Sequence, residues 1–280
     1  MKLNYELSGE QNNTQNTVIW LIHGAAGHLN HFDRITSYLI KQRFHVLTCD
    51  IRYHGSSQPI NDDPITFQFK DVLDDLDYII SLVKQTHYPD HNISVFLGGL
   101  SMGGIISLLY AVRHENKGQL KDQGIELKGI IPIGSAVPSI PFPRTEWKVY
   151  QDLTPNLELT GLMKANIVQS AEFASSQEEI QRSMKQISNV AFYKCLAAIA
   201  DILLSSNQKN QSIPPTMLPM LLIIPGKDAY TRQEMESLHE LNTLHGVASQ
   251  AVIIENALHM VILDYSSQVA TYISEFCKLH

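Results

Sequence analysis

The stretch "ISVFLGGLSMGGIISLLY", residues 93–110, places four glycines around Ser101, between one apolar run and a second aliphatic stretch. Glycines loosen a core strand and pack nothing, so their concentration here requires a local reason. The first half is typical of a buried strand and the second half of a helix. Ser101 therefore stands in a sharp turn from strand to helix, at an end of the predicted sheet.

Gly99, Ser101 and Gly103 form the pattern G-x-S-x-G in the strand–turn–helix setting of a nucleophile elbow. We expect side chains at the glycine positions to collide with the adjoining strand and helix. The helix that starts beneath Ser101 directs N–H groups and the positive end of its dipole toward developing negative charge. The plain alternative is a glycine-rich turn without chemistry.

Other apolar runs surround this stretch and are continuous in Val, Ile and Leu, which is typical of strands covered on both faces of a parallel sheet. Helical patterns separate them, so the sequence predicts an α/β fold: a mostly parallel central sheet flanked by helices. Residues 2–9 add a possible antiparallel edge strand. The predicted strands are 17–24, 44–50, 93–101, 127–135, 220–228 and 249–259, and the predicted helices are 31–42, 69–86, 103–115, 231–245 and 261–278.

The alternation breaks between Ser139 and Ser212, where no strand-like run occurs. The prolines in "PSIPFPRTEW" prevent a regular element at its start. We interpret residues 139–212 as a helical insertion between two strands, with the core formed by residues 1–138 and 213–280. Its predicted helices are 157–170, 177–187 and 190–205.

Composition narrows the class of protein. The 280 residues carry a net charge of −7, which argues against nucleic-acid and anionic-membrane partners. The N-terminus is polar without the apolar core of a signal peptide, and no run approaches the ~20 apolar residues of a membrane span. Three distant cysteines, Cys49, Cys195 and Cys277, suggest reduced thiols, no zinc site and a cytoplasmic location.

A serine nucleophile needs a base and an acid that orients it; in this chain order the acid is expected next and the histidine base last. Asp228 comes after the run at 220–228, and His259 comes after the last predicted strand. The plain alternatives are a turn or N-cap aspartate and a structural histidine. Less well placed acids are Asp201, Asp264 and Glu255.

The oxyanion of the reaction needs two N–H donors. Met102, directly after the serine, is one candidate. The other is Ala25 in "HGAAG", residues 23–27, where small residues let the backbone approach a substrate. We interpret His23 as a structural hydrogen-bonding residue and not as a second base.

Four features in this order resemble the α/β-hydrolase superfamily: "HGAAG" at 23–27, "DIRYHGSS" at 50–57, "GLSMGG" at 99–104, and the pair Asp228 and His259. The second departs from the family's D-x-R-G-x-G-x-S turn, because Tyr53 replaces a glycine. A serine at position 101 argues against the members that use an aspartate nucleophile. The elbow is similar to that of small esterases, enol-lactonases and haloperoxidase-like hydrolases, and the insertion at 139–212 then resembles their lid.

The resemblance implies a serine hydrolase that cleaves a carboxylic ester or lactone of a small, mainly apolar substrate through an acyl-enzyme, without metal or cofactor. A receptor of the same fold with slow or no turnover, and a lyase or acyltransferase with the same triad, are the alternatives. We expect a monomer or homodimer whose partner is the small-molecule substrate. The predicted substrate-binding residues in the lid are Phe142, Trp147, Met163, Phe173 and Phe192.

Overall fold

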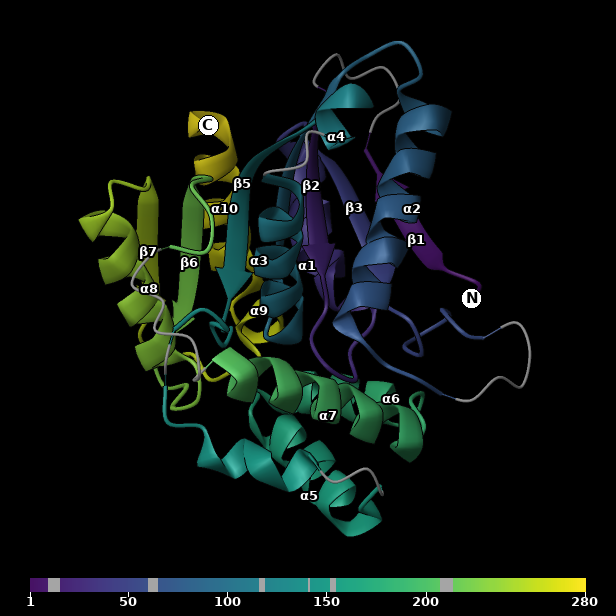
Figure 1. The fold of residues 1–280 in the computed structure, drawn as a ribbon, viewed down its shortest axis with the longest axis vertical. Coiled ribbons are helices and arrows are strands. Elements are labelled where there is room, and N and C mark those ends of the chain that lie inside the picture. The colour runs from purple at the N-terminus through teal and green to yellow at the C-terminus, as the bar shows by residue number, and fades with distance from the viewer. Residues whose placement is uncertain (10–15, 60–64, 116–118, 141, 152–154, 207–213) are drawn as a thin grey trace.

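The computed structural model describes residues 1–9, 16–59, 65–115, 119–140, 142–151, 155–206 and 214–280. A seven-stranded sheet runs through them in the order β1-β3-β2-β4-β5-β6-β7, and every neighbouring pair is parallel except β1 with β3 (Figure 1). The strands are β1 (Asn4–Ser8), β2 (Thr17–Ile22), β3 (His45–Asp50), β4 (Ile93–Leu100), β5 (Ile125–Ile133), β6 (Met220–Pro225) and β7 (Ser249–Ile254). The predicted mostly parallel α/β sheet and its antiparallel edge strand are confirmed.

Burial follows the position of each strand in the sheet. All residues of β3 and β6 are buried, as are five of the six in β2, because helices cover both faces there. In the edge strands, four of the five residues of β1 and three of the six of β7 are half-buried. Continuous apolar runs therefore mark the strands that carry most of the hydrophobic driving force.

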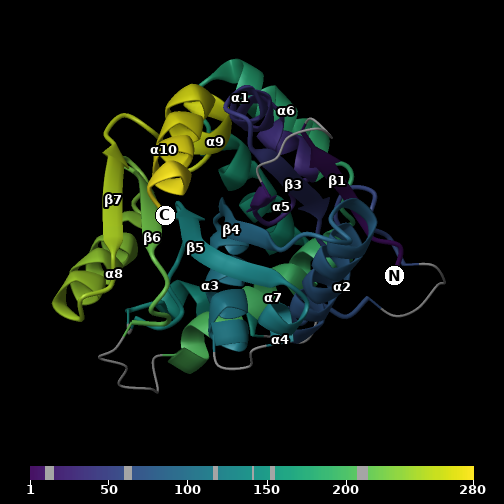
Figure 2. The same cartoon turned by 90° about the horizontal axis from the view of Figure 1, so that it is seen from above.

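Helices cover both faces of the sheet. Figure 2 shows α1 and α10 on one face, and α2, α3 and α8 on the other. The expected terminal helix is split at Tyr265, whose backbone is not helical. The helices that flank the sheet are α1 (Asp33–Lys41), α2 (Phe69–His87), α3 (Met102–Glu115), α4 (Gln119–Asp122), α8 (Arg232–Leu244), α9 (Val261–Asp264) and α10 (Ser266–Leu279), with the short 3-10 helix η1 (Leu29–Phe32) before α1.

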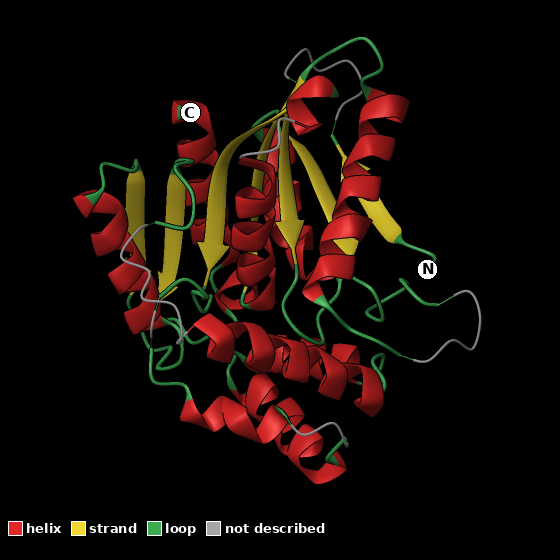
Figure 3. Cartoon of the chain, in the orientation of Figure 1, coloured by secondary structure: helices red, strands yellow, loops and turns green. Residues whose placement is uncertain are grey.

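A separate group of helices joins β5 to β6 and lies across the carboxyl ends of the parallel strands (Figures 1 and 3). We call it the helical segment; it comprises η2 (Thr145–Tyr150), α5 (Leu157–Gln169), α6 (Ala174–Met184) and α7 (Asn189–Ser206). It matches the predicted insertion, although α6 begins and ends three residues earlier than expected. The division into a core and a lid stays a prediction.

A buried ion pair ties the base of the helical segment to the sheet. Nη2 of Arg144 lies 2.6 Å from Oε2 of Glu234 on α8, and its Nε lies 3.0 Å from Oε1. The same guanidinium donates to the carbonyls of Val137 and Leu203, and Glu234 accepts from the amide of Val137. Both charged side chains are at most 4% exposed. This satisfied network fixes where the chain leaves β5 and where α7 ends.

A second contact holds the turn between α5 and α6. Asp264 accepts hydrogen bonds from the backbone N–H groups of Glu172 at 2.7 Å and Phe173 at 3.4 Å. The amide of Met260 donates to the carbonyl of Ser170 at 3.1 Å. The helical segment is therefore connected to the residues that directly follow His259.

No single helix in the described ranges is both long and apolar enough to cross a membrane. Helices α6 and α7 reach that length and hydropathy only as a pair that is bent by 104°.

Candidate active site

The turn between β4 and α3 holds Ser101 in a left-handed backbone conformation, with φ at 54°. This is an unfavourable region for a residue with a side chain, and the surrounding structure must enforce it. A Cβ on Gly99 or on Gly103 would overlap the carbonyl oxygen of Ile22 on the neighbouring strand β2. The two glycines therefore allow β4, β2 and α3 to approach closely enough to make the turn. The expected collision at these positions is confirmed.

Asp228 and His259 are in direct contact. Asp228 follows β6 by three residues, and its Oδ2 lies 2.7 Å from Nδ1 of His259, which follows β7. The Asp228 side chain is 1% exposed and that of His259 is 18% exposed. The carboxylate also accepts from the backbone N–H of Tyr230 at 3.0 Å and from the hydroxyl of Thr231 at 2.6 Å. The aspartate is therefore held from several sides while it orients the imidazole.

The two groups change each other's protonation. Burial disfavours the charged imidazole, but the attraction and the hydrogen bond of Asp228 outweigh it and raise the pKa of His259 above its ordinary value. Burial also disfavours the charged carboxylate, yet His259, Thr231 and the Tyr230 amide together lower the pKa of Asp228. Asp228 is therefore ionised at neutral pH, and His259 titrates above its ordinary range.

Ser101 and His259 each lie near residues at the end of β5. The amide of Ser101 donates to the carbonyl of Ile133 at 2.8 Å. The next residue, Gly134, lies below the imidazole: a Cβ on it would stand 3.6 Å from Nδ1 of His259. The hydrogen bonds of the described residues include none between the Ser101 hydroxyl and the imidazole. Such contacts are often long before substrate binds.

The loop after β2 lies against Ser101, as expected of an oxyanion loop. A Cβ on Gly24 would lie 3.4 Å from Cβ of Ser101, so Ala25 follows a residue that touches the elbow. The amide of Gly27 donates to the carbonyl of Gly24 at 3.0 Å and closes the loop into a tight turn. Met102, on the other side, begins α3, where N–H groups lack partners within the helix.

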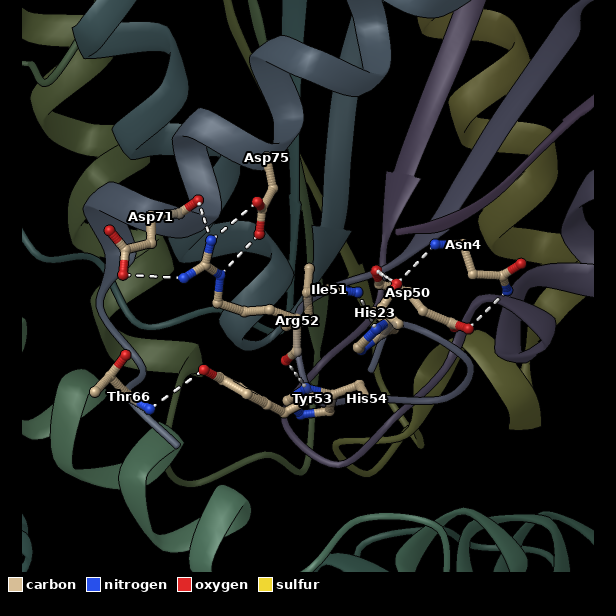
Figure 4. A network of polar contacts seen from close by, with 11 residues as sticks. Asn4, His23, Asp50, Ile51, Arg52, Tyr53, His54, Thr66, Asp71 and Asp75 are labelled. Atoms are coloured by element: carbon tan, nitrogen blue, oxygen red, sulfur yellow. Dashed lines mark hydrogen bonds and ion pairs between the residues drawn. The ribbon is translucent and has the colours of Figure 1, made fainter. Parts of the chain in front are cut away.

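His23 is held by backbone groups on both of its nitrogens (Figure 4). Nδ1 lies 2.7 Å from the carbonyl of Gly24, and Nε2 accepts from the amide of Ile51 at 3.1 Å. Nδ1 is therefore the protonated nitrogen, and the neutral ring joins the loop after β2 to the loop after β3. Burial, together with nearby histidines, lowers the pKa of His23 to about 3. These contacts support a structural interpretation of His23.

The loop after β3 belongs to the same network. Oδ1 of Asp50 accepts from the amide of Leu29 at 2.7 Å, and Arg52 pairs with Asp71 and Asp75 on α2 (Figure 4). Tyr53, in the place where the resemblance leads us to expect glycine, has φ at 66°. Its hydroxyl accepts from the amide of Thr66 at 3.2 Å, a contact that glycine cannot make.

The five residues that we predicted to bind substrate lie in different surroundings. Phe192 is fully buried, with the ammonium of Lys164 5.7 Å from its ring centre. Phe173 is 45% exposed and packs beside Tyr265, on the side of α9 and α10. The other three, Phe142, Trp147 and Met163, are half-buried. Their role in binding stays a prediction.

One contact brings α7 against the elbow. Sγ of Cys195 lies 3.1 Å from Sδ of Met102, and both side chains are fully buried. The helical segment therefore covers the residue that is expected to supply an oxyanion donor.

Within the described ranges, no group of three or more His, Cys, Asp or Glu side chains is placed to hold a metal ion. The sequence did not indicate Thr231, Arg144 or Glu234 as important. The spacing D-x-x-T ahead of a helix is the local signal for Thr231, but it also fits a helix cap. Arg144 and Glu234 are 90 residues apart and had no local signal.

The amino-acid sequence matches one known protein family. The sequence profile of a hydrolase family described as serine aminopeptidase, S33, matches residues 13–266. The comparison with curated protein sequences returned no match.

Solved structures share the fold. A thermophilic esterase from Thermogutta terrifontis superposes with a TM-score of 0.75 at 20% identity, over 99% of this chain and 93% of that one. MenH from S. aureus gives 0.73 at 20% identity, over 98% and 97% of the two chains. The enol-lactonase from Burkholderia xenovorans LB400 gives 0.73 at 17% identity, over 99% and 96%.

Proposed function

Since this chain belongs to the serine aminopeptidase S33 family of α/β hydrolases, we propose that it is a serine hydrolase that cleaves a carboxylic ester or a lactone. One observation carries the proposal: a buried Asp228 binds Nδ1 of His259, and both residues follow the strained turn of Ser101 in the expected chain order. The esterase and enol-lactonase among the similar structures have the same fold and make these two ester chemistries the first to test.

The proposed reaction begins with Ser101. Because Asp228 occupies Nδ1 of His259, Nε2 is the nitrogen that takes the proton from the Ser101 hydroxyl as its oxygen attacks the carbonyl carbon. Backbone N–H groups of Ala25 and Met102 bind the resulting oxyanion. The C–O bond to the leaving alkoxide then breaks, and His259 gives this oxygen the proton. The acyl group is left on Ser101.

Water completes the cycle. His259 takes a proton from a water molecule as its oxygen attacks the acyl carbon. The bond from that carbon to the Ser101 oxygen breaks, and the proton passes from His259 back to this oxygen. A carboxylic acid leaves the site, and no step requires an added metal or cofactor.

We propose that the helical segment acts as the lid and forms the wall of an apolar substrate pocket. It lies across the carboxyl ends of the strands, and α7 touches Met102. Aromatic and methionine side chains suit a flexible, mainly apolar acyl or alcohol group. Phe142, Trp147 and Met163, which are half-buried, remain the proposed residues that meet such a group.

A ligand-binding protein without turnover is the second candidate. The described hydrogen bonds join Asp228 to His259 but do not join His259 to Ser101, so the proton path is incomplete in this conformation. An enzyme closes this gap when substrate binds, whereas a receptor does not need to.

The test is a panel of p-nitrophenyl esters and lactones, followed by treatment with a fluorophosphonate and mass spectrometry of the chain. Rapid multiple turnover with labelling at Ser101 is expected. An aminoacyl p-nitroanilide tests the peptidase activity that the family description names. Binding of esters with a thermal shift, but neither turnover nor labelling, would favour the receptor, and a transferred or eliminated product would indicate an acyltransferase or lyase.

A further inference from the structure

Thr231 touches the same carboxylate oxygen as the imidazole. Its hydroxyl donates to Oδ2 of Asp228 at 2.6 Å, and Nδ1 of His259 lies 2.7 Å from that oxygen. The other carboxylate oxygen, Oδ1, accepts from the amide of Tyr230 at 3.0 Å. Thr231 is 5% exposed, so water does not readily replace its hydroxyl. Oδ2 thus receives two short hydrogen bonds, one of them from the triad.

A threonine at this place has an ordinary explanation, because it occupies the N-cap of α8. A threonine cap normally accepts a hydrogen bond from an N–H group in the first turn of the helix. The Thr231 side chain makes no such bond. Its hydroxyl is turned away from the helix and toward Asp228, so the start of α8 does not explain its orientation.

We propose that Thr231 is a positioning residue of the triad, whose hydroxyl fixes the Asp228 carboxylate in the rotation that presents Oδ2 to His259. This inference rests on the proposed function. A carboxylate with only its Oδ1 contact and the imidazole can turn more freely about the bond to Cβ.

The charges around the pair are few, which makes the consequence measurable. Among the described ionisable groups, Asp228 is the one whose charge shifts the pKa of His259, and His259 is the one whose charge shifts the pKa of Asp228. Without the Thr231 hydroxyl, the carboxylate turns away from the imidazole part of the time, so Asp228 stabilises the imidazolium less and the pKa of His259 falls toward its ordinary value. A loss of packing alone would not move this pKa.

The experiment compares Thr231→Val, which keeps the shape but lacks the hydroxyl, with Thr231→Ser, which retains the donor. Thr243→Val is the matched control, because the Thr243 hydroxyl donates to a carbonyl within α8. The rate of Ser101 labelling by a fluorophosphonate is measured from pH 5 to 9, and the titration of His259 is followed by NMR.

In Thr231→Val we expect labelling to slow by about tenfold at pH 8, in line with the loss of one hydrogen bond to a charged group. We expect the midpoint of the acid limb and the NMR titration of His259 to move down by about half a pH unit. Thr231→Ser should stay within about twofold of the wild type, and Thr243→Val should match it.

Two results would overturn the inference. One is a Thr231→Val protein with the rate and midpoint of the wild type. The other is an equal loss of rate in the Val and Ser variants with an unchanged midpoint, which indicates packing. If wild-type Ser101 is not labelled, the proposed function fails separately, and the NMR titration alone decides: an unshifted His259 in Thr231→Val then excludes the positioning role.

Discussion

The turn at Ser101 and the helical segment are held in place in different ways. At the turn, the backbone itself leaves no freedom, because Gly99 and Gly103 are pressed against the carbonyl of Ile22. The helical segment instead combines buried apolar side chains of α7 with a few polar contacts, Arg144 with Glu234 and Asp264 with the turn between α5 and α6. The proposed reaction therefore takes place at strand ends that close backbone contacts hold rigidly. The polar contacts that attach the helical segment lie at separate points.

The largest effect should come from the rigid region. Replacement of Ser101 by Ala is expected to lower the turnover of an activated ester by about a million-fold, because it removes the nucleophile from a cooperating triad. Steady-state kinetics with a p-nitrophenyl ester measures it. The melting temperature should be unchanged or slightly higher, since the strained backbone tolerates the smaller side chain. Undiminished turnover would end the proposed mechanism.

The next largest effect concerns the ion pair that attaches the helical segment to α8. Arg144→Met leaves the buried Glu234 carboxylate without its partner, and loss of one member of a buried ion pair costs about 3–5 kcal/mol. Denaturant unfolding measures this free energy. Arg113→Met is the control, because its ion pairs with Asp74 and Asp77 lie nearer the surface and contribute about 1 kcal/mol or less. Equal losses in both variants would contradict the special role of Arg144.

A smaller effect is expected at the second attachment point. Asp264→Asn weakens the acceptor for the amides of Glu172 and Phe173, and the turn should open about ten times more often. Hydrogen exchange of the peptide around 170–175 reports this opening. Asp201→Asn, at an exposed site on α7, should leave the exchange of the same peptide unchanged. Unaltered protection in Asp264→Asn would show that other contacts hold the turn.

The smallest expected effect is a shift in the pH dependence of activity. His259 must be neutral to accept a proton, and Asp228 raises its pKa, so activity should fall as the pH drops through a value above the ordinary ~6.5. This midpoint is higher than the unperturbed value that the sequence alone suggests. A profile of kcat/KM between pH 5 and 9 measures it. A midpoint at or below 6.5 would mean that the contact with Asp228 does not persist in solution.

The same contrast explains what the sequence could predict. Each central strand could be predicted because burial on both faces requires a continuous apolar run. The elbow was visible because its glycines and serine are within five residues. The order of Asp228 and His259 then followed from the fold, and the structure brings these two side chains into contact.

Features that depend on contacts between residues far apart in the sequence could not be predicted. Helix α6 begins at Ala174, three residues before the predicted start, next to a turn whose amides are bound by Asp264, 91 residues away. The break at Tyr265 coincides with a side chain that packs on Phe173 and donates to Glu172. No local pattern contains these partners.

The buried thiols have a practical consequence for measuring motion. Cys49, Cys195 and Cys277 are all buried, and burial raises the pKa of Cys49 to about 12 and also raises the pKa values of the other two. A thiol-reactive dye should therefore not react with the native chain and should attach only to an introduced cysteine. Leu162, on the outer side of α5 and 59% exposed, offers such a position. Fluorescence from a probe there would test whether the helical segment moves relative to the sheet, without any need to alter the natural cysteines.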